Sequence, residues 1–161
     1  MTMSHSVTIR TQTMTTSSTV VINTSYLRTW SGIFKVLELA LGVVCVAIAA
    51  IHMPTYYVTT PHLFFLLMTT TFLIGTAILL MSCLASFSTS SIIAKTTYEI
   101  LYHSAAFALY LAASLTFIIP VSDMKGSQQY NVLMAAAVCG LVNAVLYFLS
   151  TLIALRAYRG L

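Results

Sequence analysis

The chain has 161 residues, of which 59% are hydrophobic and only 6% are charged. Soluble domains carry about 25% charged residues, so seven Lys and Arg with three Asp and Glu are too few to cover a soluble globule. This composition argues against a soluble enzyme and against a disordered chain, which would need low hydrophobicity and high charge. The net charge of +4 does not indicate nucleic-acid binding, because the basic residues are scattered and form no patch. We predict an integral membrane protein.

Residues 1–25 contain 13 Ser and Thr and one Arg, a composition that cannot form a core. They are predicted to be a disordered cytoplasmic tail. The apolar stretch Val20–Ile22 is too short for a cleavable signal peptide, so the first spanning helix is expected to act as the internal targeting signal. Either the tail is regulated by phosphorylation, or it is a low-complexity segment without a specific regulatory role.

Four long apolar runs follow the tail, and each is at least 22 residues long. A helix needs roughly 20 residues to cross the hydrocarbon core. Continuous apolar runs also exclude a membrane β-barrel, whose strands alternate in hydrophobicity. The predicted fold class is therefore all-α, a four-helix transmembrane bundle that forms one domain over residues 26–158, with a short cytoplasmic C-terminus at 159–161. The predicted helices cover residues 32–53, 63–84, 98–119 and 132–155.

The orientation follows from the positive charges, because cytoplasmic segments carry an excess of Lys and Arg. In an up-and-down bundle, five basic residues fall on one side: Arg28, Lys35, Lys95, Arg156 and Arg159. The opposite side has only Lys125, which Asp123 partly offsets. Both termini are predicted to be cytoplasmic.

Ionisable residues inside the membrane are the first place to look for function. Lys35 and Glu38 lie three residues apart in the first predicted helix, and Glu99 and His103 lie four apart in the third. One interpretation is an ion or proton path. The other is a structural cluster in which Lys35 extends to the interface, the acids pair across the two helices, and Glu38 and His103 clasp them together. We favour the structural cluster, because a path also needs polar groups at mid-depth.

The middle of the predicted membrane region holds few polar residues. Asn143 is the clearest of them and is expected to hydrogen-bond to another helix. The prolines at 54, 61 and 120 are expected at helix ends, so the broken helices of a transporter are not predicted.

Small residues recur at helical spacing in two of the predicted helices. The two stripes are Ser104, Ala108 and Ala112, and Ala136, Gly140 and Ala144. Small side chains allow helices to approach closely in lipid. Packing within the bundle is the favoured role, and lateral self-association is the alternative.

Catalytic, cofactor and metal sites are not predicted. Cys45, Cys83 and Cys139 lie in different apolar runs, without the paired spacing of metal ligands. No nucleophile has the polar neighbours that it would need. Cys83 lies near the cytoplasmic end of its helix, where palmitoylation is the alternative to a buried small apolar residue.

Three segments carry a family resemblance. Gly32–Gly42 (GIFKVLELALG) is similar to the start of the first helix of MARVEL-domain proteins of the MAL, plasmolipin and chemokine-like-factor branch. Glu99–Ala112 (EILYHSAAFALYLA) resembles the third helix of that family, and the end of the last helix, Leu146–Arg156, is similar as well. The resemblance covers about residues 26–158 and extends to the Ser/Thr-rich tail of plasmolipin-like members.

The resemblance implies a non-enzymatic tetraspanning protein of membrane-domain organisation, membrane apposition or vesicle traffic. It implies a plasma-membrane or endosomal and Golgi location, with sterol- and sphingolipid-rich lipids, other membrane proteins or a second copy as partners. A small channel or proton-coupled carrier that uses Lys35, Glu38, Glu99 and His103 is the alternative. A junction or adhesion protein is less favoured, because outer loops of about nine and twelve residues offer little surface against the ~800 Å² per partner of stable interfaces.

Overall fold

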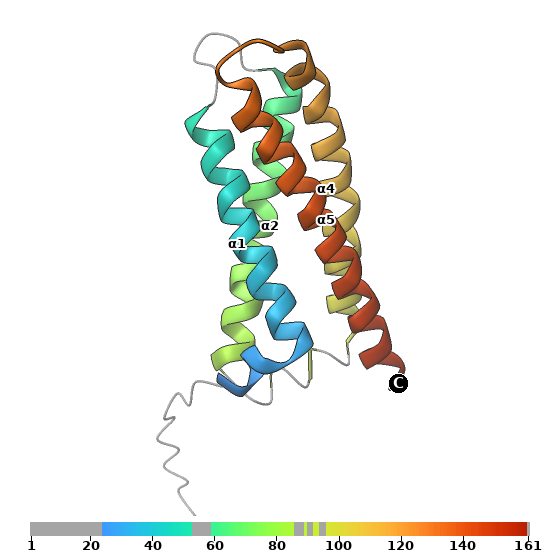
Figure 1. Ribbon diagram of the computed structural model, residues 1–161. Helices are drawn as coiled ribbons and strands as arrows, with labels where there is room; N and C mark the ends of the chain where they lie inside the picture. Colours follow the sequence, from blue (N-terminus) through green and yellow to red (C-terminus); the bar gives the residue numbers. More distant parts are fainter. Residues whose placement is uncertain (1–23, 53–58, 86–88, 90–91, 94–95, 161) are drawn as a thin grey trace, which may run out of the picture.

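The computed structural model describes residues 24–52, 59–85, 89, 92–93 and 96–160. The predicted tail therefore lies outside the described residues except for its last two, and so does Lys95. Within the described part, a short 3-10 helix, η1 (Thr24–Arg28), is followed by four long helices (Figure 1). These are α1 (Trp30–Ile51), α2 (Thr60–Ala85), α4 (Thr97–Asp123) and α5 (Tyr130–Arg159).

All four long helices are long and apolar enough to cross a membrane. The shortest, α1, has 22 residues, or about 33 Å at 1.5 Å per residue, against a hydrocarbon core of about 30 Å. The all-helical architecture with four membrane-spanning-length helices is confirmed in the described part of the chain. These helices indicate a multi-pass membrane protein.

Three helices, α2, α4 and α5, extend further than predicted at both ends. Pro120 was expected at a helix end, but α4 continues through it to Asp123. A proline this close to the end removes one backbone hydrogen bond of the last turn, which the helix tolerates. Similarly, α5 includes Arg159, which was placed in the C-terminal segment. Basic residues favour the last turn, where carbonyl groups are unpaired, and Gly160 then ends the helix in the left-handed conformation at φ 72°.

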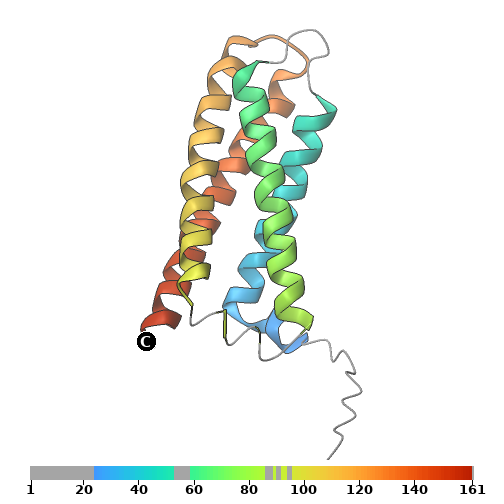
Figure 2. The same cartoon turned by 180° about the vertical axis from the view of Figure 1, so that it is seen from behind.

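The four helices form a closed ring. Neighbours in the chain pack together, α1 on α2, α2 on α4 and α4 on α5, and α5 also packs on α1. The start of α1 and the end of α5 lie at the same end of the bundle, and the end of α1, the start of α2 and the α4–α5 connection lie at the other (Figures 1 and 2). The first and last spans are therefore direct neighbours.

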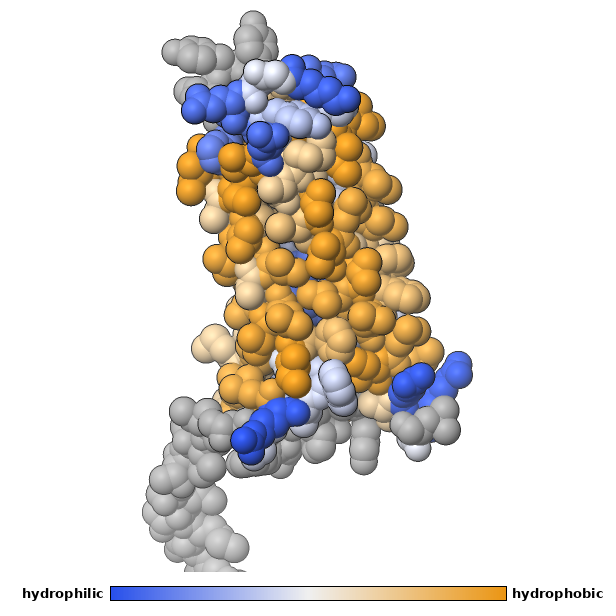
Figure 3. Space-filling model, viewed as in Figure 1, coloured by the Kyte–Doolittle hydropathy of each residue, from blue (hydrophilic) through white to orange (hydrophobic). Residues whose placement is uncertain are grey.

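On the face of the bundle seen in Figure 3, apolar side chains cover the surface between two polar ends. Every long helix contributes exposed large hydrophobic residues, among them Val43, Ile74, Leu115 and Val145. The inside combines aromatic and small residues: Phe65 and Phe117 stack with ring centroids 4.6 Å apart, and Ala113 and Ala136 are buried beside them. An apolar exterior of this extent is typical of a lipid-facing surface.

The entry to α1 is tightly built. The Thr29 hydroxyl caps the helix by accepting a hydrogen bond from the Gly32 N–H at 3.1 Å. Gly32 lies against the Tyr26 carbonyl, and a Cβ at residue 32 would overlap that oxygen. Burial raises the pKa of the Tyr26 hydroxyl above its ordinary value of 10.0, so this hydroxyl is neutral at physiological pH. The Thr29 cap and the close approach of Gly32 to the Tyr26 carbonyl hold the 3-10 helix η1 against the start of α1.

Candidate functional site

An ion pair closes one end of the bundle interior. The Lys35 ammonium on α1 donates to the Glu99 carboxylate on α4 and, at 2.7 Å, to the Ser31 hydroxyl. It also lies 5.8 Å from the centre of the Tyr26 ring, within cation–π range. The expectation that Lys35 extends to the interface is wrong, because its side chain is only 1% exposed. The reason is Glu99, which offers the ammonium an anionic partner inside the bundle.

Glu38 joins α1 to α5. One of its carboxylate oxygens, Oε1, accepts a hydrogen bond from the Ser150 hydroxyl. Its backbone carbonyl accepts a hydrogen bond from the Asn143 side-chain amide at 3.3 Å. Glu38, Asn143 and Ser150 are all buried. The interhelical hydrogen bond expected of Asn143 is therefore present, and it goes to the backbone of α1.

The second carboxylate oxygen of Glu38 faces His103 on α4. Oε2 lies 3.8 Å from the His103 Nε2 atom, which is too long for a hydrogen bond. The other ring nitrogen, Nδ1, lies 2.8 Å from the Glu99 carbonyl oxygen and must donate to it. A neutral His103 then presents a bare Nε2 to a carboxylate oxygen, so two acceptors face each other. A proton on either group, or a water molecule between them, resolves this conflict.

A chain of hydroxyl groups crosses the bundle next to this pair. Tyr102 on α4 donates to the Phe72 carbonyl of α2 at 3.1 Å. The Thr76 hydroxyl lies 2.9 Å from that of Tyr102 and 2.8 Å from that of Tyr147 on α5. Because Tyr102 has already used its proton, Thr76 donates to Tyr102 and Tyr147 donates to Thr76. This network, which ties α2, α4 and α5 together, was not predicted from the sequence.

Six buried polar atoms have no hydrogen bond of acceptable geometry within the described residues. They come from all four long helices and are Glu38 Oε2, His62 Nε2, His103 Nε2, the Tyr110 hydroxyl oxygen, Ser114 Oγ and Asn143 Oδ1. On α4 they are spread from His103 to Ser114, about 16 Å along the axis at 1.5 Å per residue. His62 packs edge-on against Phe117, one turn further on, with ring centroids 4.6 Å apart.

The six buried polar atoms reach from the end of the bundle that holds the Lys35–Glu99 ion pair past the middle of the bundle. Buried polar atoms in folded proteins nearly always have a partner, and internal water supplies it where protein groups do not. A signal for this set exists in the sequence: Glu99, His103, Tyr110 and Ser114 follow one another at spacings of four, seven and four, which places them on one helix face.

The two predicted small-residue stripes have different locations. Ala136, Gly140 and Ala144 are buried in the bundle, and a Cβ at residue 140 would overlap Ser114 Oγ and lie 2.8 Å from a Phe65 ring carbon. Ala108 and Ala112 are exposed on the outside of α4, and Ser104 is half-buried. The prediction that Ala108 and Ala112 pack within the bundle is therefore wrong. The face of α4 that is turned inward is the one that carries His103 and Tyr110. Their lateral self-association stays a prediction.

The cysteines are mostly enclosed. Cys83 is 2% exposed, which favours the buried apolar role over palmitoylation. Cys45 is also buried and donates a weak hydrogen bond to the Ala136 carbonyl, with sulfur and oxygen 3.7 Å apart, and Cys139 is half-buried. Among the described residues, no three His, Cys, Asp or Glu side chains lie close enough to hold a metal ion.

The buried polar groups of the bundle can therefore hold the helices together, and they can bind water and protons in the bundle interior.

No protein-family model, curated protein or solved structure matches this chain.

Proposed function

We propose that this chain is a MARVEL-like, non-enzymatic membrane protein that organises membrane domains, membrane apposition or vesicle traffic through lipid and helix contacts. Both termini face the cytoplasm, and the protein resides in the plasma membrane or in endosomal and Golgi vesicles. Its partners are membrane lipids, including sterol- and sphingolipid-rich ones, other membrane proteins and a second copy of itself.

One observation carries this proposal: the described exterior offers large apolar surface within the membrane and little outside it. Exposed Val, Leu, Ile and Met residues lie on all four long helices, whereas the described α4–α5 connection is confined to residues 124–129. The charged side chains of Lys35, Glu38 and Glu99 are buried inside the bundle. A partner would therefore meet this protein mainly through the outer faces of its helices.

The proposal is tested with fluorescently labelled protein in giant vesicles that separate into a sterol- and sphingomyelin-rich ordered phase and a disordered phase. We expect the protein to concentrate in the ordered phase or at the phase boundary and to change the size of the domains. A labelled single-span peptide of equal length serves as the control. Distribution like that of the peptide, with unchanged domains, would contradict the proposal.

A second candidate function is proton conduction through the bundle interior. The observation that favours it is the row of buried polar atoms, because Tyr110, Ser114 and Asn143 supply the mid-depth polar groups that a path requires. In this candidate the Glu38–His103 pair holds the transferred proton, and bound water links it to the hydroxyl and amide groups beyond.

Proton flux into liposomes that contain a pH-sensitive dye tests this second candidate. Conduction predicts a flux that Glu38→Gln abolishes and that Tyr110→Phe reduces, because the phenylalanine keeps the ring but removes the mid-depth hydroxyl. Tyr98→Phe is the matched control, since Tyr98 is exposed on the outside of α4. A flux equal to that of empty liposomes would exclude conduction and leave the first proposal in place.

A further inference from the structure

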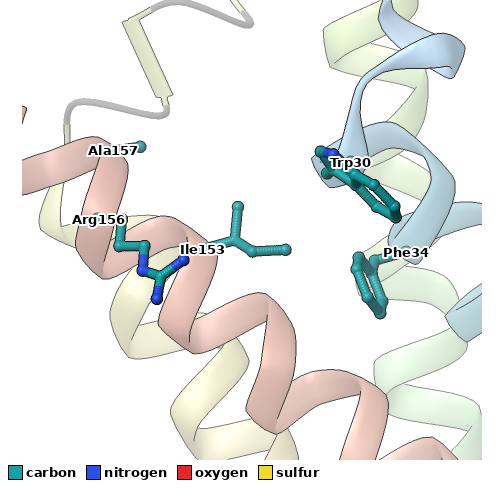
Figure 4. A pocket seen from close by; sticks show the side chains of 5 residues that line it. All are labelled: Trp30, Phe34, Ile153, Arg156 and Ala157. Carbon is teal, nitrogen blue, oxygen red and sulfur yellow. The ribbon is translucent and has the colours of Figure 1, made fainter. Parts of the chain in front are cut away.

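A pocket lies on the outer surface between the start of α1 and the end of α5. Its volume is about 530 Å³, which is within the roughly 300–1,000 Å³ typical of sites for small molecules. Two aromatic rings of α1 form one wall, and side chains of α5 form the other (Figure 4). The lining residues are Trp30, Phe34, Ile153, Arg156 and Ala157.

The lining combines apolar walls with a single cation. Figure 4 shows Ile153 pointing from α5 toward Trp30 and Phe34, whereas the Arg156 side chain lies alongside α5. Trp30 is 73% exposed and Arg156 is also exposed, so a ligand can reach both. Such a site suits a molecule with a long apolar part and a negatively charged end.

The surrounding charge favours an anion. The chain has three acidic residues. Glu38 and Glu99 are buried in the bundle, and Asp123 is the last residue of α4, which ends at the opposite end of the bundle. No acidic side chain is therefore exposed beside Arg156. Arg159, in the same last turn of α5, adds to the positive charge of this end.

The position of the pocket identifies the kind of anion. Trp30 is the first residue of α1 and Arg156 lies in the last turn of α5, so both stand where a spanning helix meets the lipid headgroups. Tryptophan is enriched at this depth, with its ring between headgroups and acyl chains. A ligand there has its acidic group at headgroup level and its apolar part in the hydrocarbon.

We propose that this pocket binds an anionic phospholipid. Its phosphate and acidic headgroup contact the Arg156 guanidinium, and one acyl chain lies between the aromatic wall of Trp30 and Phe34 and the aliphatic wall of Ile153. The inference rests on the proposed function, for which it names a class of lipid. The orientation proposed there turns this end toward the cytoplasmic leaflet, which carries the anionic lipids.

Trp30 is the only tryptophan of the chain, so its fluorescence reports on the pocket directly. The full-length protein is placed in phosphatidylcholine vesicles that contain a small, fixed fraction of lipid with brominated acyl chains, which quench tryptophan on contact. Brominated phosphatidylglycerol is compared with brominated phosphatidylcholine. We expect about fivefold preference for phosphatidylglycerol, as for one basic residue next to anionic headgroups.

Two variants separate the pocket from the general charge of this end. Arg156→Gln should abolish the preference, whereas Arg159→Gln removes an equal charge outside the pocket lining and should retain most of it. Ala157→Phe should lower quenching by phosphatidylglycerol, because the larger side chain fills the pocket. Helicity and thermal unfolding of each variant establish that it is folded; all three positions are exposed, so the bundle interior is unchanged.

Equal quenching by the two brominated lipids would overturn the proposal. So would equal losses in Arg156→Gln and Arg159→Gln, which would indicate diffuse attraction to the surface, or full quenching in Ala157→Phe. These results concern headgroup preference at one pocket. Partition into ordered domains tests the proposed function separately, so failure of one experiment is distinguishable from failure of the other.

Discussion

Lys35 and Glu99 illustrate why a charge can be tolerated far from water. Each is buried, and each finds its partner on another helix. Removal of one member of such a pair leaves an uncompensated charge, whereas removal of both leaves no buried charge. The ion pair therefore specifies how α1 and α4 meet more than it contributes to the net stability.

The first prediction concerns this pair. Lys35→Met or Glu99→Leu alone should destabilise the protein by about 3–5 kcal/mol, because the remaining charge is buried without a partner. The double variant should lose much less than the sum of the two. Unfolding of the purified protein in detergent measures all four members of the cycle, and additive losses would show that the two residues do not interact.

The second prediction concerns Glu38. Glu38→Gln should be mild or stabilising, because the amide can donate to the bare Nε2 of His103 while its oxygen still accepts from Ser150. Glu38→Leu leaves both groups without a partner and should cost about 1–3 kcal/mol. Thermal unfolding and delivery to the cell surface are compared for the two variants. Equal behaviour would refute the role of Glu38 as an interhelical clasp.

At the scale of helices, the apolar runs predicted the four spans because lipid requires long continuous apolar segments. The helix ends were less accurate, since Pro120 and Arg159 are compatible with helix at positions that composition assigns to loops. The members of the charged cluster were found by residue type, and Glu38 faces His103 as expected, with 3.8 Å between Oε2 and Nε2. The Lys35–Glu99 pair and the outward position of Ala108 were not predicted, because the rotation of each helix depends on packing.

The third prediction tests the packing of α5. Gly140→Leu should destabilise the bundle by about 1–3 kcal/mol, the usual range for overfilling a packed interior. The reason is that the leucine side chain would meet Ser114 and Phe65. Val145→Leu, at an exposed position of the same helix, is the control and should be neutral. Both are compared by thermal unfolding in detergent and by surface delivery. If the two variants unfold alike, the close contact at Gly140 is unimportant.

At the scale of the whole molecule, both described ends of the chain lie on one side of the bundle, with the α4–α5 connection on the other. Which of these sides meets the cytoplasm depends on insertion. The positive charges of Arg28, Arg156 and Arg159 predict that it is the side with the termini.

The fourth prediction tests this orientation. Ser127, exposed in the α4–α5 connection, should react as Ser127→Cys with a membrane-impermeant maleimide added to intact cells. The tail sequon Asn23-Thr24-Ser25 should carry no glycan, because a cytoplasmic tail does not meet the transferase. A glycosidase-sensitive mass shift that disappears in Asn23→Gln, together with unreactive Ser127→Cys, would reverse the topology.

The closure of the ring by α5 has a consequence for synthesis. Lys35 precedes its partner Glu99 by 64 residues, and Glu38 precedes Ser150 by 112. At roughly 5–20 residues per second, Glu38 waits roughly 6–22 seconds for Ser150 to be made. During that time α1 holds charged side chains that its final neighbours have not yet covered. A chain that stops after α2 would keep Lys35 and Glu38 without their partners on α4 and α5.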